Sequence, residues 1–214
     1  MLFKRKQPSQ SLFKIFSFYN HLVNPEVPKQ QRAVFQKFGL SINQIFDKRF
    51  SHGGFLNSIC RHVKDTDYLI FFDIDCIPTR KEWFQLLLAD LLETRTIVGA
   101  AQTANHLRDA RNLYVSPFFF AISTAYLKAL DYPDMNMFPD MDAGQNLTEH
   151  VIRDGGNVKY WWPTEIEEDK WSLYHPEHTR FGPGTTYNDA IYHAFYSRDN
   201  LSDGFFKKCK AVLS

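Results

Sequence analysis

The sequence has few cysteines and no long apolar run, and both absences narrow what the chain can be. Its three cysteines, Cys60, Cys76 and Cys209, form no metal-spaced pair and leave one thiol unpaired in any bridging scheme. A disulfide framework is therefore not expected, and a reducing compartment fits this cysteine usage best. No segment reaches the roughly 20 consecutive apolar residues of a membrane-spanning helix. Residues 1–10 are basic, but no signal-peptide cleavage site follows them. We expect a soluble, cytoplasmic protein.

The chain also lacks an excess of either charge. Lys and Arg number 25, Asp and Glu number 24, and the formal net charge is +1. This balance creates no field of one sign that would attract nucleic acid or an anionic membrane surface, so neither is expected as a partner. With 44% apolar residues, a chain of 214 residues can bury a substantial core. One domain, residues 1–214, is the simplest expectation at this length.

Short apolar runs, typical of strands, alternate along the chain with segments in which apolar residues have helical spacing. Residues 163–188 are instead polar and aromatic, contain several Gly and Pro, and are expected to form a long surface loop. Alternating strands and helices predict an α/β fold with a mostly parallel central sheet flanked by helices, in which ligands bind beyond the carboxyl ends of the strands. Strands are predicted at residues 12–18, 41–46, 68–72, 96–102, 118–123 and 158–161, and helices at 30–38, 55–63, 81–94, 142–154 and 205–212.

Two carboxylates stand at the end of the most apolar strand. The run YLIFF, residues 68–72, is followed by Asp73-Ile74-Asp75. A turn that starts at Ile74 can direct both carboxylates toward one cation. A hard cation such as Mg²⁺ or Mn²⁺ prefers carboxylate, phosphate and water oxygens, so two Asp ligands leave coordination positions for a diphosphate. The alternative is that one Asp caps the helix after Pro78 and the other is only solvated.

The order of these segments resembles that of the GT-A glycosyltransferases, in which a metal-binding DxD motif follows an apolar strand. The resemblance covers about residues 12–198, and it implies one Rossmann-like domain with a nucleotide half of about residues 11–104 and an acceptor half of about 105–200. It also implies Mn²⁺ or Mg²⁺ as cofactor, a nucleotide-sugar donor with UDP favoured, and a glycan or glycoprotein acceptor. Short GT-A domains encoded by large DNA viruses are similar in size. If this chain is viral, it would act in the host cytoplasm. The resemblance rests on the segments SHGGFLNSICRHV, YLIFFDIDCIP, YVSPFFFAIS, DAGQNLTEHVI and IYHAFYSR.

The resemblance assigns the metal ligands. Asp73 would lie near the ribose and the metal, and Asp75 would bind the metal directly. His193, in the segment IYHAFYSR, is similar in position to a late histidine that supplies another ligand in many such enzymes. A hydrogen-bonded histidine on a buried strand is the alternative for His193.

Residues for the nucleotide are carried over in the same way. The end of the first strand lies beside the base and ribose in this family, so Phe18, Tyr19 and Asn20 are the matching residues. Tyr19 would stack on the base and Asn20 would bind a base edge, unless Phe18 is core and Asn20 begins a turn. His52, with Gly53-Gly54 after it, would bring a helix N-terminus to phosphate oxygens, although Gly-Gly is otherwise only a flexible turn.

An inverting transfer needs a general base on the face of the sugar opposite the departing nucleotide. Asp142 begins a predicted helix after the segment MNMFPDM, where inverting GT-A enzymes often have their catalytic carboxylate. The alternatives are that Asp142 only caps that helix, that Asp140 is the base, or that the mechanism is retaining. A bound metal would stabilise the leaving diphosphate.

Two other functions compete with glycosyl transfer. The string YLIFFDIDCIP also resembles haloacid-dehalogenase phosphatases, in which the first Asp of DxD is the nucleophile. In those enzymes the strand comes early and Gly-Thr or a similar pair follows, whereas here two strand-helix units precede it and Cys76-Ile77 follow. The other alternative is a carbohydrate-binding scaffold without turnover.

Overall fold

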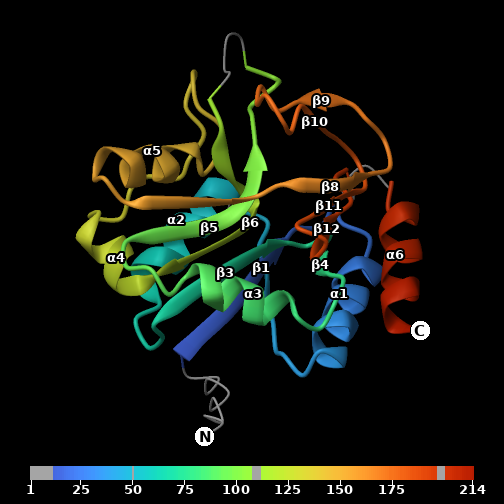
Figure 1. Cartoon of the computed structure of the whole chain (residues 1–214). Helices are drawn as coiled ribbons and strands as arrows, with labels where there is room; N and C mark the ends of the chain where they lie inside the picture. Colours follow the sequence, from blue (N-terminus) through green and yellow to red (C-terminus); the bar gives the residue numbers. More distant parts are fainter. Residues whose placement is uncertain (1–11, 50, 108–111, 197–200) are drawn as a thin grey trace, which may run out of the picture.

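The structure, a computed structural model, describes residues 12–49, 51–107, 112–196 and 201–214. The basic segment 1–10 and the end of the segment IYHAFYSR lie outside these ranges. A six-stranded sheet of order β2-β1-β3-β6-β5-β7 forms the centre of the described chain (Figure 1). Its strands are β1 (Phe13–Tyr19), β2 (Asn43–Phe46), β3 (Tyr68–Asp73), β5 (Thr96–Gln102), β6 (Tyr114–Ser123) and β7 (Asn157–Trp161).

The central sheet is mostly parallel, which confirms the predicted fold class. Strand β1 pairs in parallel with β2 and β3, and β5 pairs in parallel with β7, whereas β6 runs antiparallel to β3 and β5. Strands β3 and β6 are buried along nearly their whole length. Such unbroken apolar runs are typical of strands that helices cover on both faces.

The side chains of β3 separate the two helical layers. Ile70 and Phe72 point into one core, and Leu69 and Phe71 point into the other, because successive residues of a strand face opposite sides. The sheet therefore lies between the two helical layers (Figure 1). Helices α1 (Glu26–Lys37) and α3 (Trp83–Asp90) pack on the first face, and α2 (His52–His62), α4 (Thr124–Ala129) and α5 (Gln145–Arg153) pack on the second.

A second, smaller sheet corrects the expectation of a long surface loop over residues 163–188. Much of that segment forms short strands, and the smaller sheet has the order β4-β12-β11-β8. The prediction was wrong because strands of two to four residues have no readable alternation and depend on partners remote in sequence. The strands are β4 (Cys76–Pro78), β8 (Pro163–Ile166), β11 (Thr185–Tyr187) and β12 (Ile191–His193), with β9 (Trp171–Ser172) and β10 (Arg180–Phe181) forming a separate pair.

Helix starts differ from the predicted ones for local reasons. Helix α1 begins at Glu26, because Pro28 falls in the first turn, where its missing N–H is not needed. Helix α2 begins at His52, because the Ser51 hydroxyl accepts a hydrogen bond from the Gly54 N–H and caps the helix. Helix α3 begins at Trp83, two residues after the predicted start, and no side chain caps it.

Helix α5 begins at Gln145 rather than at Asp142. Gly144, immediately before Gln145, has a φ of 78°, a left-handed conformation that ends any helix continuing toward Asp142. The last helix, α6 (Asp203–Leu213), was predicted and packs beside α1 (Figure 1). The thiols of all three cysteines are free and buried. Within the described ranges, every helix is too short or too polar to cross a membrane.

Candidate metal centre and active-site cleft

The turn between β3 and β4 positions both carboxylates of the DxD motif. Strand β3 ends at Asp73 and β4 begins at Cys76, so Ile74 and Asp75 form the connection. Strand β12 runs antiparallel to β4 and pairs His193 with Cys76, and the N–H of the next residue donates to the Asp75 carbonyl at 3.1 Å. This register places His193 beside the turn, although 118 residues separate it from Asp75.

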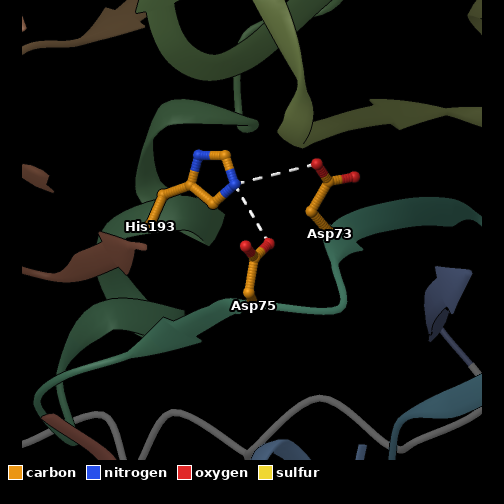
Figure 2. A group of neighbouring side chains, drawn as sticks. All are labelled: Asp73, Asp75 and His193. Carbon is orange, nitrogen blue, oxygen red and sulfur yellow. Dashed lines mark hydrogen bonds and ion pairs between the residues drawn. The ribbon is translucent and has the colours of Figure 1, made fainter. Parts of the chain in front are cut away.

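Asp73, Asp75 and His193 point toward one another, as Figure 2 shows. The Nε2 atom of His193 lies 3.2 Å from Oδ1 of Asp75 and 3.7 Å from Oδ2 of Asp73. One ligand atom from each residue lies within 4.8 Å of the others. Divalent cations bind carboxylate oxygens and imidazole nitrogens, and three protein ligands leave positions for phosphate oxygens and water. The donor set therefore fits a divalent cation.

Packing holds the His193 imidazole in place. Its ring stacks on Phe118 with a centroid distance of 4.0 Å, and Phe195 lies 3.8 Å away by the same measure. The side chain is almost fully buried, and its Nδ1 has no hydrogen-bond partner among the described residues. The aromatic contacts, rather than a hydrogen bond to Nδ1, therefore set the ring plane and aim Nε2 at the carboxylates.

His52 approaches the same centre from helix α2. Its Nε2 lies 3.2 Å from Oδ1 of Asp73, so the Asp73 carboxylate faces one imidazole with each oxygen. Gly53, next along α2, is needed for a different reason from the one expected. A Cβ at this position would collide with the backbone of Met135 and Asn136, so glycine permits the loop between α4 and α5 to pack closely against α2.

A cleft of about 500 Å³ lies over these groups at the carboxyl ends of β1 and β3. This is the edge of a parallel sheet where ligands are expected. All eight site residues predicted from the sequence line it: Phe18, Tyr19, Asn20, His52, Asp73, Asp75, Asp142 and His193.

Aromatic rings stand beside the end of β1. Tyr19 is paired in register with Phe46 at the end of β2, and their ring centroids lie 5.4 Å apart. Phe46 is half exposed, so its ring is available next to the cleft. Phe18 stacks on Phe55 of α2 and belongs partly to the core. The side chain of Asn20 accepts a hydrogen bond from a backbone N–H two residues later and so begins a turn while lining the cleft.

Asp142 is held by neighbours that the sequence did not reveal. Its Oδ2 accepts a hydrogen bond from the Tyr114 hydroxyl at 2.6 Å, and its Oδ1 accepts one from the Ala143 N–H at 2.8 Å. Burial, and then the charge of Asp142, raise the pKa of Tyr114 well above its ordinary value, so this phenol stays a donor. The Nε2 atom of His106 lies 3.9 Å from Oδ1 of Asp142. Asp140, the competing base, is exposed and does not line the cleft.

Comparisons with known proteins identify the fold. No family model matches the chain, and no curated protein matches its sequence. A glycosyltransferase involved in the glycosylation of the major capsid of PBCV-1 superposes with a TM-score of 0.54 and 13% identity, over 92% of this chain and 99% of that chain. This chain has the GT-A fold.

Other GT-A structures superpose less closely. Drosophila β1,4-galactosyltransferase 7, solved with manganese, UDP-Gal and xylobiose, has a TM-score of 0.47 and 13% identity, over 87% of this chain and 73% of that chain. The catalytic domain of the same enzyme with xylobiose has a TM-score of 0.48 and 13% identity, over 88% of this chain and 72% of that chain.

Three residues near the cleft of this GT-A fold were missed by sequence reasoning. Phe46 was read only as a strand residue, although its place at the carboxyl end of β2 is a usable signal. Tyr114 stands at the start of β6, four residues before the predicted start of that strand. His106 lies in the connection before it and carries no local pattern. Strand pairing brings Phe46 and Tyr114 near the site, and the loop after β5 brings His106 near Asp142.

Proposed function

We propose that this chain is a metal-dependent glycosyltransferase that moves a sugar from a nucleotide-diphosphate sugar to a hydroxyl group of a glycan or glycoprotein. The observation that carries this proposal is the convergence of Asp73, Asp75 and His193 within one cleft that Asp142 also lines. The fold it shares with a viral capsid glycosyltransferase supports it. A UDP-sugar is the favoured donor because UDP is the commonest nucleotide in the family that the sequence resembles. Residues 1–214 would act as one domain.

The diphosphate of the donor would bind at the metal centre. Asp73, Asp75 and His193 would hold Mn²⁺ or Mg²⁺, which supplies positive charge against the departing diphosphate. His52 occupies the first position of α2, where its ring and the helix N-terminus can both donate to phosphate oxygens.

The nucleoside would bind at the end of β1. The half-exposed Phe46 ring and the partly buried Tyr19 ring form an aromatic pair at that edge and offer a surface on which a base can stack. The side-chain oxygen of Asn20 is engaged in its own turn, which leaves its NH₂ group for a base or ribose oxygen.

Asp142 would act as the general base of an inverting transfer. Its carboxylate takes the proton of the acceptor hydroxyl while that oxygen forms a bond to the anomeric carbon and the bond from this carbon to the diphosphate oxygen breaks. The Tyr114 hydroxyl and the Ala143 N–H each bind one carboxylate oxygen, which orients the group and leaves lone pairs for the acceptor proton.

Calorimetry with Mn²⁺ and a panel of nucleotide sugars tests the proposed function. We expect the wild-type chain to bind one class of nucleotide sugar only when Mn²⁺ is present. Asp75→Ala should abolish this binding and the transfer reaction, because it removes a metal ligand from a buried centre. Asp65→Ala, which removes an exposed carboxylate paired with Lys14, is the matched control and should bind like wild type.

Two outcomes would overturn the proposed function. One is the absence of metal-dependent binding by any nucleotide sugar, and the other is unchanged binding and transfer in Asp75→Ala. Release of inorganic phosphate from small phosphoesters with Mg²⁺ would instead support the phosphatase alternative. Binding of the donor with neither sugar transfer to a glycan nor hydrolysis of the donor would support a non-catalytic scaffold.

A further inference from the structure

A buried side-chain amide on helix α1 donates hydrogen bonds to both ends of the turn that carries the DxD carboxylates. The Nε2 atom of Gln31 donates to the Asp73 carbonyl at 2.7 Å and to the Cys76 carbonyl at 2.9 Å. These two carbonyls bracket Ile74 and Asp75, so one side chain spans the turn that carries two of the three candidate ligands. Gln31 is fully buried.

Neighbouring side chains fix the orientation of this amide. The Oε1 atom of Gln31 accepts a hydrogen bond from Nε2 of Gln44 on strand β2 at 2.9 Å. Nε2 of Gln44 also donates to the Pro28 carbonyl at 2.7 Å, and its Oε1 accepts from Arg32 at 2.7 Å. Every polar atom of the Gln31 amide therefore has a partner of the correct type, and a flipped amide would face carbonyl with carbonyl.

Helical spacing makes a polar residue at this position unusual. Gln31 lies on the buried face of α1 together with Val27, Val34 and Phe35. An apolar side chain would be expected at this position of an amphipathic helix, because burying an amide is costly unless all its hydrogen bonds are made. The bonds that satisfy this amide lead directly to the DxD turn. On its other side, the turn is held by the Ala194 N–H, which donates to the Asp75 carbonyl.

We propose that Gln31 is a positioning residue of the metal centre. It holds the Asp73–Cys76 turn in the shape that directs both carboxylates to one cation, so its loss weakens cation binding although no ligand is removed. Residues that orient metal ligands in this way typically change affinity by about 10–100-fold when they are replaced. This role rests on the metal centre of the proposed function, and the experiment below separates the two.

The test measures Mn²⁺ affinity alone, by the electron paramagnetic resonance signal of the free ion. Gln31→Met keeps the length of the side chain and removes its hydrogen bonds, and we expect its dissociation constant to rise about tenfold. The matched control is Val151→Ala, a buried change in α5 on the opposite face of the sheet. It should lower the thermal midpoint and leave Mn²⁺ affinity unchanged, which separates positioning from general loss of stability.

A second variant keeps the test decisive if Gln31→Met does not fold. Gln44→Leu leaves Gln31 in place and removes the N–H that orients it, at a half-buried position, and should raise the dissociation constant about threefold. Wild-type affinity in each folded variant would overturn the role of Gln31 while leaving the metal centre intact. Absence of Mn²⁺ binding by the wild-type chain would overturn the metal centre itself, and the role of Gln31 with it.

Discussion

The side of the cleft with the proposed metal ligands, Asp73, Asp75 and His193 (the metal side), is held mainly by backbone pairing. The side with the proposed general base, residues 130–144 (the base side), is a loop that side chains join to the neighbouring helices. Strand β12 bonds to β4 through the main chain and carries His193 to the DxD turn. The loop instead joins α4 to α5 and reaches the cleft at Asp142. Main-chain hydrogen bonds persist when a side chain is replaced, so, apart from Gln31 and the ligands themselves, we expect the base side to depend more strongly on individual substitutions.

A few polar contacts anchor the base-side loop. Asn57 of α2 donates to the Asp134 carboxylate at 2.6 Å and accepts a hydrogen bond from the Met135 N–H at 2.9 Å. Asn146 of α5 donates to the Asp134 carbonyl at 2.9 Å. These contacts join the loop to the two helices beside it, and Tyr114 then orients the carboxylate at its end. Four predictions follow the contrast between the two sides, in order of decreasing effect.

Asp142→Asn should have the largest effect on transfer and almost none on binding. The amide keeps the shape of the side chain but cannot accept the acceptor proton, so the transfer rate should fall about 10³-fold. Mn²⁺ and donor affinities should stay at wild-type values, because the metal side is intact. Asp140→Asn, in the exposed turn two residues earlier, is the control and should transfer normally. Full activity in Asp142→Asn would place the base elsewhere.

His193→Phe should give the converse result. A phenyl ring can occupy the stack between Phe118 and Phe195 but offers no ligand nitrogen, so Mn²⁺ affinity should fall at least about 100-fold. Titration of Mn²⁺ by paramagnetic resonance measures this loss. His62→Phe, an exposed change on α2, should bind Mn²⁺ normally. An unchanged affinity in His193→Phe would remove the histidine from the ligand set.

Tyr114→Phe should slow transfer about tenfold without changing Mn²⁺ affinity. It removes one hydrogen bond to a charged carboxylate, which contributes on the order of 1.5 kcal/mol. Steady-state kinetics should place the loss in kcat rather than in the KM for the donor. In the Asp142→Asn background the same change should cost little more, because the two residues act through one carboxylate. An equal loss of transfer rate in the wild-type and Asp142→Asn backgrounds would contradict the inference that Tyr114 acts through Asp142.

The smallest effect concerns stability. It is absent near neutral pH and appears in alkali. Burial in the core beneath α2 raises the pKa of the Cys60 thiol to about 12. The folded state therefore retains a proton that the unfolded chain releases above about pH 9. This thiol's contribution is complete below that pH, and the free energy of unfolding falls by about 1.4 kcal/mol per unit as pH rises toward 12. Urea denaturation between pH 8 and 11 should show a shallower decline in Cys60→Ala, and identical slopes would contradict this origin.

Local pattern predicted the central sheet well and the second sheet poorly. Strand β5 occupies the predicted residues, and β3 extends its predicted range only by Asp73, because a strand buried on both faces is an unbroken apolar run. Helix starts were missed by three or four residues where Pro28, Ser51 or Gly144 set the boundary. Residues 18–20, Asp73 and Asp75 lie together because the carboxyl ends of the parallel strands β1 and β3 share one edge, whereas His52, Asp142 and His193 reach that edge from a helix, a loop and the second sheet.

The sequence by itself determined the alternation of strands and helices and the places where polar residues end buried strands, since both are encoded within a few neighbouring residues. Only the tertiary structure decided three contacts. His193 lies beside Asp75, Tyr114 donates a hydrogen bond to Asp142, and Gln31 donates hydrogen bonds to the DxD turn. Each of these contacts joins segments that are 28 to 118 residues apart. They depend on the register of strand pairs and the packing of helices, which nearest-neighbour patterns do not specify.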